Sequence, residues 1–262
     1  MSLTVRTRGP IVPIHPHRAD RRGLSGNLSL RWLLPALALS ASVAHAGRPL
    51  ATDDAGTAEA GSCQVELWQD RSRQARDTVL APACGLPGGL EIGAEHVWPR
   101  PAADLRGAGA LSLKWAPSQA RRETAAGELA LGLKLALDVE HPVDAGPRQA
   151  GSSVLALATL RPGKDLALHL NLGLATARGS SPAAGSGWVA RAALAWTPSE
   201  PWLVFAEALG NGRPAAFGST VLAAGVRRWI VPERLGLDLT LARERGGPRV
   251  LGAGLGWYGI GL

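Results

Sequence analysis

The sequence predicts an all-β protein, a transmembrane antiparallel β-barrel of about twelve strands, and three observations predict it. Apolar side chains recur at every second position in many runs of the chain. Tryptophans gather near the ends of these runs, where membrane barrels place aromatic side chains at the two lipid–water interfaces. A secretory signal peptide precedes the runs. The alternative is a soluble β-sandwich that holds its tryptophans in the core.

The signal peptide is predicted within residues 27–46. Arg31 precedes an uncharged apolar stretch from Trp32 to about Val43, and Ala44-His45-Ala46 supplies a small-x-small cleavage site. The stretch is shorter than the roughly 18 to 20 apolar residues that a membrane helix needs. We therefore expect a leader and signal peptide at 1–46, a periplasmic segment at 47–61 and the barrel at 62–262.

The net charge gives no support to a nucleic-acid-binding function. The whole chain has 28 basic and 21 acidic residues, but the first 46 positions hold six arginines against one acidic residue, Asp20. The remaining part has 22 basic and 20 acidic residues, with no basic stripe interleaved with aromatic side chains. Its length of about 216 residues fits one barrel domain.

The alternation predicts the strands individually. In the run 127–139, leucines occupy every second position from Leu129 to Leu137, and alanine, glycine or charged residues lie between them. A strict period of two excludes an amphipathic helix, whose apolar positions recur at three and four. The expected strands are 62–71, 76–84, 89–98, 109–116, 127–139, 152–160, 165–177, 187–197, 201–209, 218–230, 235–243 and 249–261.

The second face of these strands is predicted to line the lumen. Alanine and glycine dominate it and single charges interrupt it, which is typical of a confined interior, whereas the outer face of a sandwich carries polar residues anywhere. The expected lumen-lining residues are Glu91, Lys114, Glu128, Lys134, Asp138, His169, Asn171, Arg191, Glu207, Arg227 and Asp238. The expected aromatic girdle consists of Trp98, Trp115, Trp188, Trp196, Trp202, Trp229 and Trp257.

The connections alternate in length, as in outer-membrane barrels with short periplasmic turns and longer outer loops. Short turns follow the second, sixth, eighth and tenth expected strands, and longer stretches such as Glu140–Gly151 and Arg178–Ser186 follow others. The connection 117–126 is long for a periplasmic turn, so the expected strand number is twelve, plus or minus two. Cys63 and Cys84 then fall at one end of neighbouring strands, where a disulfide is favoured over a free buried pair.

The segment before the first strand carries a motif, Arg48-Pro49-Leu50-Ala51-Thr52-Asp53-Asp54-Ala55-Gly56-Thr57. It resembles the opening of bacterial outer-membrane proteins described as transporters of the meta-pathway of phenol degradation. Residues 224–229 and 237–239 are similar to the final hairpins of that family. The resemblance implies about twelve strands and passage of aromatic or other small apolar compounds. Two features depart from the expected barrel pattern: the chain ends in Leu262 instead of an aromatic residue, and it has one tyrosine and two phenylalanines.

Enzymatic and metal-binding interpretations find little support. His169-x-Asn171 could suggest a lipid hydrolase, but no serine lies on the same strand, so a lumen-lining pair is favoured. Asp53-Asp54 could bind a cation, yet a solvated turn that caps or plugs the periplasmic mouth is favoured. We predict no catalytic residue, no metal and no cofactor.

The sequence therefore predicts a passive channel or transporter for small molecules in the outer membrane of a Gram-negative cell. Its expected partners are the lipid bilayer, the outer-membrane assembly machinery and a small-molecule solute, with no nucleic acid. A non-conducting structural barrel with a side-chain-filled lumen is the main alternative, because twelve strands enclose a narrow bore. A barrel lipid hydrolase is a more distant one.

Overall fold

The structure is a computed structural model that describes residues 50–102, 104–178, 185–212 and 220–261. The leader and signal peptide predicted at 1–46 lie outside the described residues, as do Arg48 and Pro49 of the opening motif. Within the described ranges, no helix is long and apolar enough to cross a membrane. The elements in chain order are β1 (Ser62–Arg71), β2 (Arg76–Leu86), β3 (Leu90–Arg100), β4 (Leu105–Trp115), η1 (Ser118–Ala120), β5 (Arg121–Thr124), β6 (Gly127–Pro142), β7 (Arg148–Gly163), β8 (Leu166–Ala177), β9 (Gly185–Ser199), β10 (Trp202–Asn211), β11 (Thr220–Val231), β12 (Leu235–Glu244) and β13 (Arg249–Gly261).

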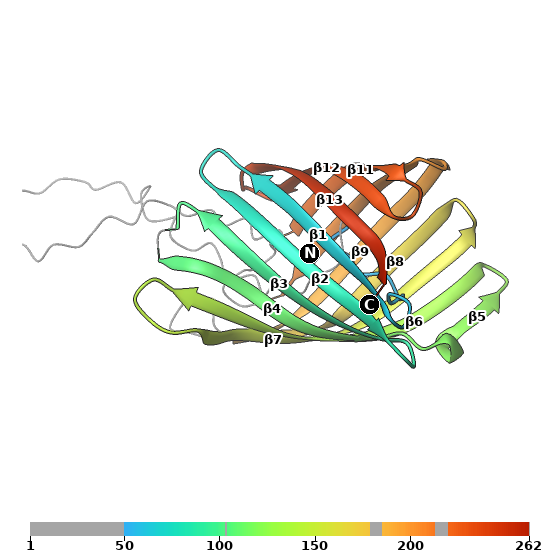
Figure 1. Ribbon diagram of the computed structural model, residues 1–262, viewed down its shortest axis with the longest axis horizontal. Helices are drawn as coiled ribbons and strands as arrows, with labels where there is room; N and C mark the ends of the chain where they lie inside the picture. The colour runs from blue at the N-terminus through green and yellow to red at the C-terminus, as the bar shows by residue number, and fades with distance from the viewer. Residues whose placement is uncertain (1–49, 103, 179–184, 213–219, 262) are drawn as a thin grey trace, which may run out of the picture.

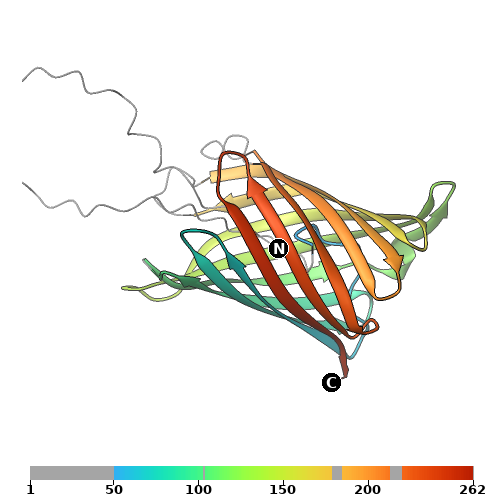
Figure 2. The same ribbon diagram turned by 90° about the horizontal axis from the view of Figure 1, so that it is seen from above.

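The strands form one closed antiparallel barrel. Consecutive strands pair with each other except β4 and β5, and β1 pairs with β13 at the junction of the two chain ends. The strand β4 pairs with residues 133–142 of β6, whereas the short β5 pairs with its first four residues. Because β4 and β5 pair one after the other with the same edge of β6, they fill a single strand position. The barrel therefore has twelve strand positions. Figure 1 and Figure 2 show the strands inclined to the barrel axis, and the predicted fold is confirmed.

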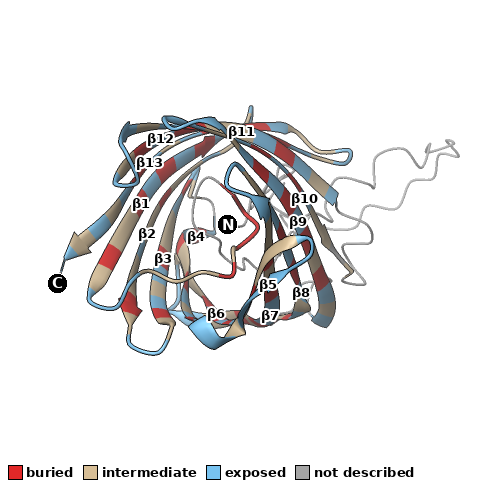
Figure 3. Ribbon diagram, turned by 90° about the vertical axis from the view of Figure 1, so that its right-hand side faces the viewer, coloured by how far each residue is buried: buried red, intermediate tan, exposed pale blue. Residues whose placement is uncertain are grey.

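The barrel is apolar outside and polar inside. Leucines of β6 and β8 are exposed, for example Leu137 and Leu172, while the intervening Lys134 and Asn171 are buried on the inner face. Figure 3 shows this alternation of buried and exposed positions along the strands. A protein surrounded by water does not expose leucine rows of this extent, because each exposed side chain forgoes about 1.5 to 3 kcal/mol of burial. The outer surface therefore fits hydrocarbon.

The exposed tryptophans form two rims. Trp115, Trp196, Trp202 and Trp257 lie at the strand ends nearest the chain termini, and Trp98 and Trp188 lie at the opposite ends. Trp229 departs from the expected girdle, since it is half-buried and its ring lies 5.7 Å from that of Tyr258 on the lumen side. A break in the β11–β12 register between Trp229 and Val231 accompanies this placement.

Two predicted connections differ in the structure. The expected loop Glu140–Gly151 is mostly paired, because β6 and β7 extend past the rim, and the connection itself is 143–147. An ion pair of 3.2 Å between Arg148 and Glu140 joins the extended strands. The long connection 117–126 contains η1 and β5, so it adds hydrogen bonds to the edge of β6 instead of forming a plain turn.

The N-terminal segment, residues 50–61, enters the barrel (Figure 3), and Leu50, Ala51 and Ala55 are buried there. Leu50 packs with Phe205, and Ala51 packs with Trp68 and Val79. Ala55 joins a cluster that includes Leu155 and Leu157 of β7. Three buried apolar clusters thus lie between this segment and the inner wall, and a fourth, formed by Ala223, Ala242 and Val250, lies within the wall itself.

Candidate functional site

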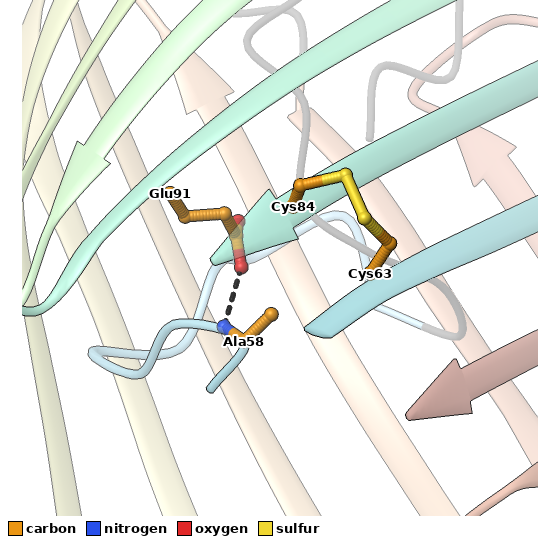
Figure 4. Close-up of a disulfide and its surroundings, with 4 residues drawn as sticks. All are labelled: Ala58, Cys63, Cys84 and Glu91. Carbon is orange, nitrogen blue, oxygen red and sulfur yellow. Dashed lines mark hydrogen bonds between the residues drawn. A yellow bond between two sulfur atoms is a disulfide. The ribbon is translucent and has the colours of Figure 1, made fainter. Parts of the chain in front are cut away.

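The root of the N-terminal segment is fixed at the end of the barrel that carries the termini. A disulfide joins Cys63 at the start of β1 to Cys84 near the end of β2 (Figure 4). These residues lie directly opposite each other in the β1–β2 register, which is the arrangement that a cross-strand bridge requires. The point at which the chain leaves the wall is therefore covalently tied to its neighbouring strand.

The segment passes close to β2 before it turns into the lumen. A Cβ at Gly85 would lie 2.1 Å from the carbonyl oxygen of Ala58, so this position requires glycine. The amide of Gly61 donates to the Gly85 carbonyl at 3.1 Å. Further in, the Ala58 amide donates to a Glu91 carboxylate oxygen at 2.8 Å (Figure 4). Glu91 thus binds the segment from the wall.

Glu207 and Arg191 hold the deepest part of the segment. The Glu207 carboxylate accepts hydrogen bonds from the Ala51 amide at 2.8 Å and 3.0 Å and from the Thr52 amide at 2.9 Å. It also accepts one from the Thr52 hydroxyl at 3.0 Å. The Arg191 guanidinium donates to the Ala51 carbonyl at 2.9 Å. Two charged wall residues therefore satisfy the backbone of Ala51 and Thr52.

Asp53 lies at the centre of the contacts and is almost fully buried. One carboxylate oxygen lies 2.7 Å from the Lys134 ammonium, and the other lies 3.3 Å from that of Lys114. The Asn171 amide bonds the Asp53 backbone twice, accepting from its N–H and donating to its carbonyl, both at 2.8 Å. Burial alone would raise the pKa of Asp53, but the two ammonium groups hold that pKa well below its ordinary value. Asp53 is therefore ionised. The solvated turn expected for Asp53-Asp54 is wrong for Asp53, which is buried in the lumen, whereas Asp54 is about half exposed.

The neighbouring Asp54 has a different environment. Its side chain is about half exposed, and one oxygen lies 3.5 Å from the Lys114 ammonium. Besides Asp53 and Asp54, the Glu91 carboxylate also lies near the Lys114 ammonium, at 3.5 Å. Lys114 is thus shared among three carboxylates from two parts of the chain. No group of three or more His, Cys, Asp or Glu side chains that could hold a metal ion occurs within the described ranges.

Thr159 and His169 complete the contacts with the segment. The Ala55 amide donates to the Thr159 hydroxyl oxygen at 2.8 Å, and that oxygen lies 3.0 Å from Nδ1 of His169. The His169-x-Asn171 pair thus faces the lumen, where Asn171 binds the backbone of the segment and His169 contacts a threonine. Neither contact places a serine beside the histidine, as a lipid hydrolase would need.

The other expected lumen residues lie apart from these contacts. Glu128 is partly exposed near the rim and pairs with Arg161 at 2.9 Å, and Asp138 is buried on the inner face of β6. Arg227 forms two hydrogen bonds with Asp238, at 2.7 Å and 2.8 Å. Its guanidinium lies 4.8 Å from the ring centre of Trp229 and 4.9 Å from that of Tyr258.

Sequence reasoning missed several residues on the inner face. Glu66 accepts a hydrogen bond from the Tyr258 hydroxyl, and the Trp68 indole donates to Asp70 at 3.1 Å. The period of two along β1 places all three of its residues on the inner face, so the alternation could have identified them. Thr159 carried no comparable signal, because a threonine fits either face of a strand.

A cavity of about 500 Å³ lies between the segment and the wall. Residues from strand ends near the chain termini line it, among them Glu66, Lys114, His169 and Tyr258. Asp53 and Asp54 of the segment face it as well. The cavity therefore adjoins the central ion pairs and lies toward the end of the barrel that carries the termini.

Comparison with known proteins places the chain in a family. Residues 34–261 match the model of the family described as uncharacterised conserved protein UCP029691. The chain belongs to this family. A search of curated proteins found no match.

Several solved structures resemble this chain in fold at low sequence identity. This chain is similar to the KdgM porin, with a TM-score of 0.56, 7% identity and coverage of 74% of this chain and 98% of that one. It is similar to the NanC porin, with a TM-score of 0.55, 9% identity and the same coverage. An outer membrane channel from Pseudomonas putida F1 gives a TM-score of 0.52, 12% identity and coverage of 78% and 98%. These similarities establish an outer-membrane porin-like fold, and the resemblance to the phenol-degradation family is not confirmed.

Proposed function

We propose that this protein is a passive outer-membrane channel for small solutes, and that its N-terminal segment closes the lumen in the state described above. The observation that carries the proposal is that a segment separate from the wall fills the middle of the barrel. Wall side chains, namely those of Glu207, Arg191, Asn171, Thr159 and Glu91, hold its backbone. Water can replace such contacts one by one, so the segment can leave while the barrel remains intact.

The location follows from the outer surface. Its leucine rows and two tryptophan rims are stable in contact with lipid, and the β1–β13 and β4–β6 pairings close the barrel. We propose export through a signal peptide at 1–46 that is cleaved near Gly47, followed by insertion by the outer-membrane assembly machinery. The mature N-terminus would then begin only a few residues before Leu50, which is buried in the barrel.

The lining supports a polar solute. The resemblance to the phenol-degradation family predicted aromatic or apolar compounds. However, the cavity is lined by charged side chains such as Lys114, Glu66 and Arg227, and an apolar solute would have to displace their water without replacing its hydrogen bonds. We propose small polar solutes, moving by diffusion with no cofactor and no chemical step.

A non-conducting barrel is the second candidate, and the buried ion pairs of Asp53 favour it, because they stabilise the filled state. Single-channel recording in planar bilayers separates the two functions. The wild-type channel is expected to be closed most of the time. Removing the charge in Asp53→Asn breaks two buried ion pairs, and a cost of about 3 kcal/mol to the closed state would raise the open-to-closed ratio about a hundredfold.

Asp54→Asn is the matched control, because Asp54 is half exposed and its ion-pair contact is a single one of 3.5 Å. It is expected to leave the open probability nearly unchanged. If wild type and Asp53→Asn both fold, with heat-modifiable gel mobility, and neither produces conductance steps, the channel is refuted and the filled structural barrel is correct.

A further inference from the structure

We propose that Lys114 and Lys134 form a carboxylate-binding site of the lumen. Asp53 occupies this site in the closed state, and a carboxylate-bearing solute occupies it when the segment is displaced. This inference rests on the proposed function, since it requires the N-terminal segment to leave the lumen. It goes further by naming the chemical class that the lumen selects.

The first argument is the register of the two lysines. Lys114 on β4 and Lys134 on β6 are direct cross-strand partners, and both side chains are more than nine-tenths buried. Like charges directly opposite each other destabilise a sheet, and burial increases their repulsion because it removes water. Within the described ranges, Asp53 is the one carboxylate at ion-pair distance from Lys134. The wall supplies Glu91 to Lys114 at 3.5 Å, whereas the carboxylate at ion-pair distance from Lys134 comes from the N-terminal segment.

The second argument is the geometry of that anion. Asp53 uses its two oxygens separately, Oδ2 for Lys134 at 2.7 Å and Oδ1 for Lys114 at 3.3 Å. Two ammonium groups on adjacent strands therefore bind the two ends of one planar group. A carboxylate satisfies both at once, whereas a neutral amide of the same size offers one acceptor oxygen and no charge.

The third argument is access. Lys114 and Asp53 both line the cavity of about 500 Å³, so a solute in the cavity already touches one side of the site. Next to the site, Glu207 holds the amides of Ala51 and Thr52, and the Thr52 hydroxyl. A carboxylate solute that also carries hydroxyl or amine donors would satisfy Glu207 when the segment leaves. The lumen therefore fits polar carboxylic acids better than neutral or basic solutes.

Chemical rescue of Asp53→Ala in the full chain tests the site. The variant leaves both lysines without their shared carboxylate, and sodium acetate is the probe that replaces it. Acetate is expected to reduce the conductance of Asp53→Ala in a saturable way. Its half-blocking concentration should be at least about tenfold lower than that of acetamide, since only the ion forms charge-assisted hydrogen bonds.

Two controls locate the effect. Adding Lys134→Met to Asp53→Ala is expected to abolish the difference between acetate and acetamide, and Asp54→Ala, which keeps the Asp53 carboxylate, should show no saturable block. If the alanine variant does not give the heat-modifiable mobility of a folded barrel, Asp53→Asn replaces it, because it preserves the size of the side chain.

The outcomes separate this inference from the channel itself. Conductance that acetate and acetamide reduce equally would overturn the carboxylate site and leave the channel standing. If no variant conducts, the thermal stability of Asp53→Ala in detergent decides. A rise in melting temperature with acetate but not with acetamide would support the site while the channel fails, and the absence of such a rise would overturn the site.

Discussion

Replacing Leu137 by arginine is expected to destabilise the barrel by about 2 to 4 kcal/mol. Leu137 is exposed on the outer face of β6. Its level in the membrane follows from the register. At one rim, Trp115 of β4 pairs with Leu133. At the other rim, Trp98 lies two residues beyond His96, which pairs with Gly109, and the β4 residue two positions before Gly109 is Gly107. Gly107 pairs with His141, so position 141 of β6 marks that rim. Leu137 is halfway between positions 133 and 141, and therefore near the bilayer midplane.

The magnitude depends on depth. A guanidinium at the midplane loses its hydration and gains no partner, whereas an arginine at position 133 can reach the interface beside Trp115. Leu133→Arg is therefore expected to cost about 0 to 1 kcal/mol, clearly less than Leu137→Arg. Leu137→Ala, which removes apolar contact without adding charge, serves as the matched control.

Equilibrium unfolding in guanidinium chloride, in lipid vesicles and followed by tryptophan fluorescence, measures these differences. The account of the outer face would be refuted if Leu137→Arg cost no more than Leu133→Arg. It would also be refuted if wild-type protein folded as a monomer in water without detergent or lipid.

Three further perturbations test the segment and its root. Replacing both Cys63 and Cys84 by serine is expected to lower the free energy of unfolding by about 3 kcal/mol, since the bridge closes a loop between residues 21 apart. Denaturant titration measures this change, and an unchanged midpoint would contradict the stabilising role of the disulfide. Gly85→Ala should push the segment away from β2 and raise the open probability, because the new Cβ would lie 2.1 Å from the Ala58 carbonyl oxygen. Gly163→Ala is the control, because its Cβ meets nothing within 4 Å and should leave the open probability unchanged. Equal effects of the two substitutions in bilayer recordings would refute the close contact. The pKa of Asp53 in the closed state is below its ordinary value of 3.8, so its contribution to closure is fully present above about pH 4 and is lost as pH falls through the lowered pKa. The ratio of open probability between Asp53→Asn and wild type should therefore be the same at about pH 8 and pH 5, and a ratio that shrinks at pH 5 would contradict the ion pairs.

The sequence predicted the wall of this barrel well because the wall follows a local rule. A period of two identifies a strand, and the type of residue on each face identifies lipid and lumen, so the rows around Leu133 and Lys134 could be placed without any long-range information. The extension of β6 to Pro142 and the pairing of β5 were not predictable in this way. Those residues lack regular alternation, and their pairing depends on partner strands.

The depth of the N-terminal segment could not be predicted for a different reason. Thr52, Asp53 and Asp54 have the composition of a solvated turn, and no local pattern distinguishes a buried turn from an exposed one. Burial of Asp53 is stabilised by Lys114 and Lys134, which follow it by 61 and 81 positions in the sequence. Such complementarity becomes visible only when the closed barrel brings these strands around the segment.

The most direct test of the central claim, that the N-terminal segment lies inside the lumen, is the rate at which a membrane-impermeant thiol reagent modifies single introduced cysteines. The native cysteines are bridged and do not react. Ala51→Cys, at a fully buried position, is expected to react about a hundredfold more slowly than Glu59→Cys, at an exposed one, and adding Asp53→Asn should accelerate only the reaction at position 51. Equal rates at the two positions in the folded protein would contradict the account, because the segment would then lie outside the barrel.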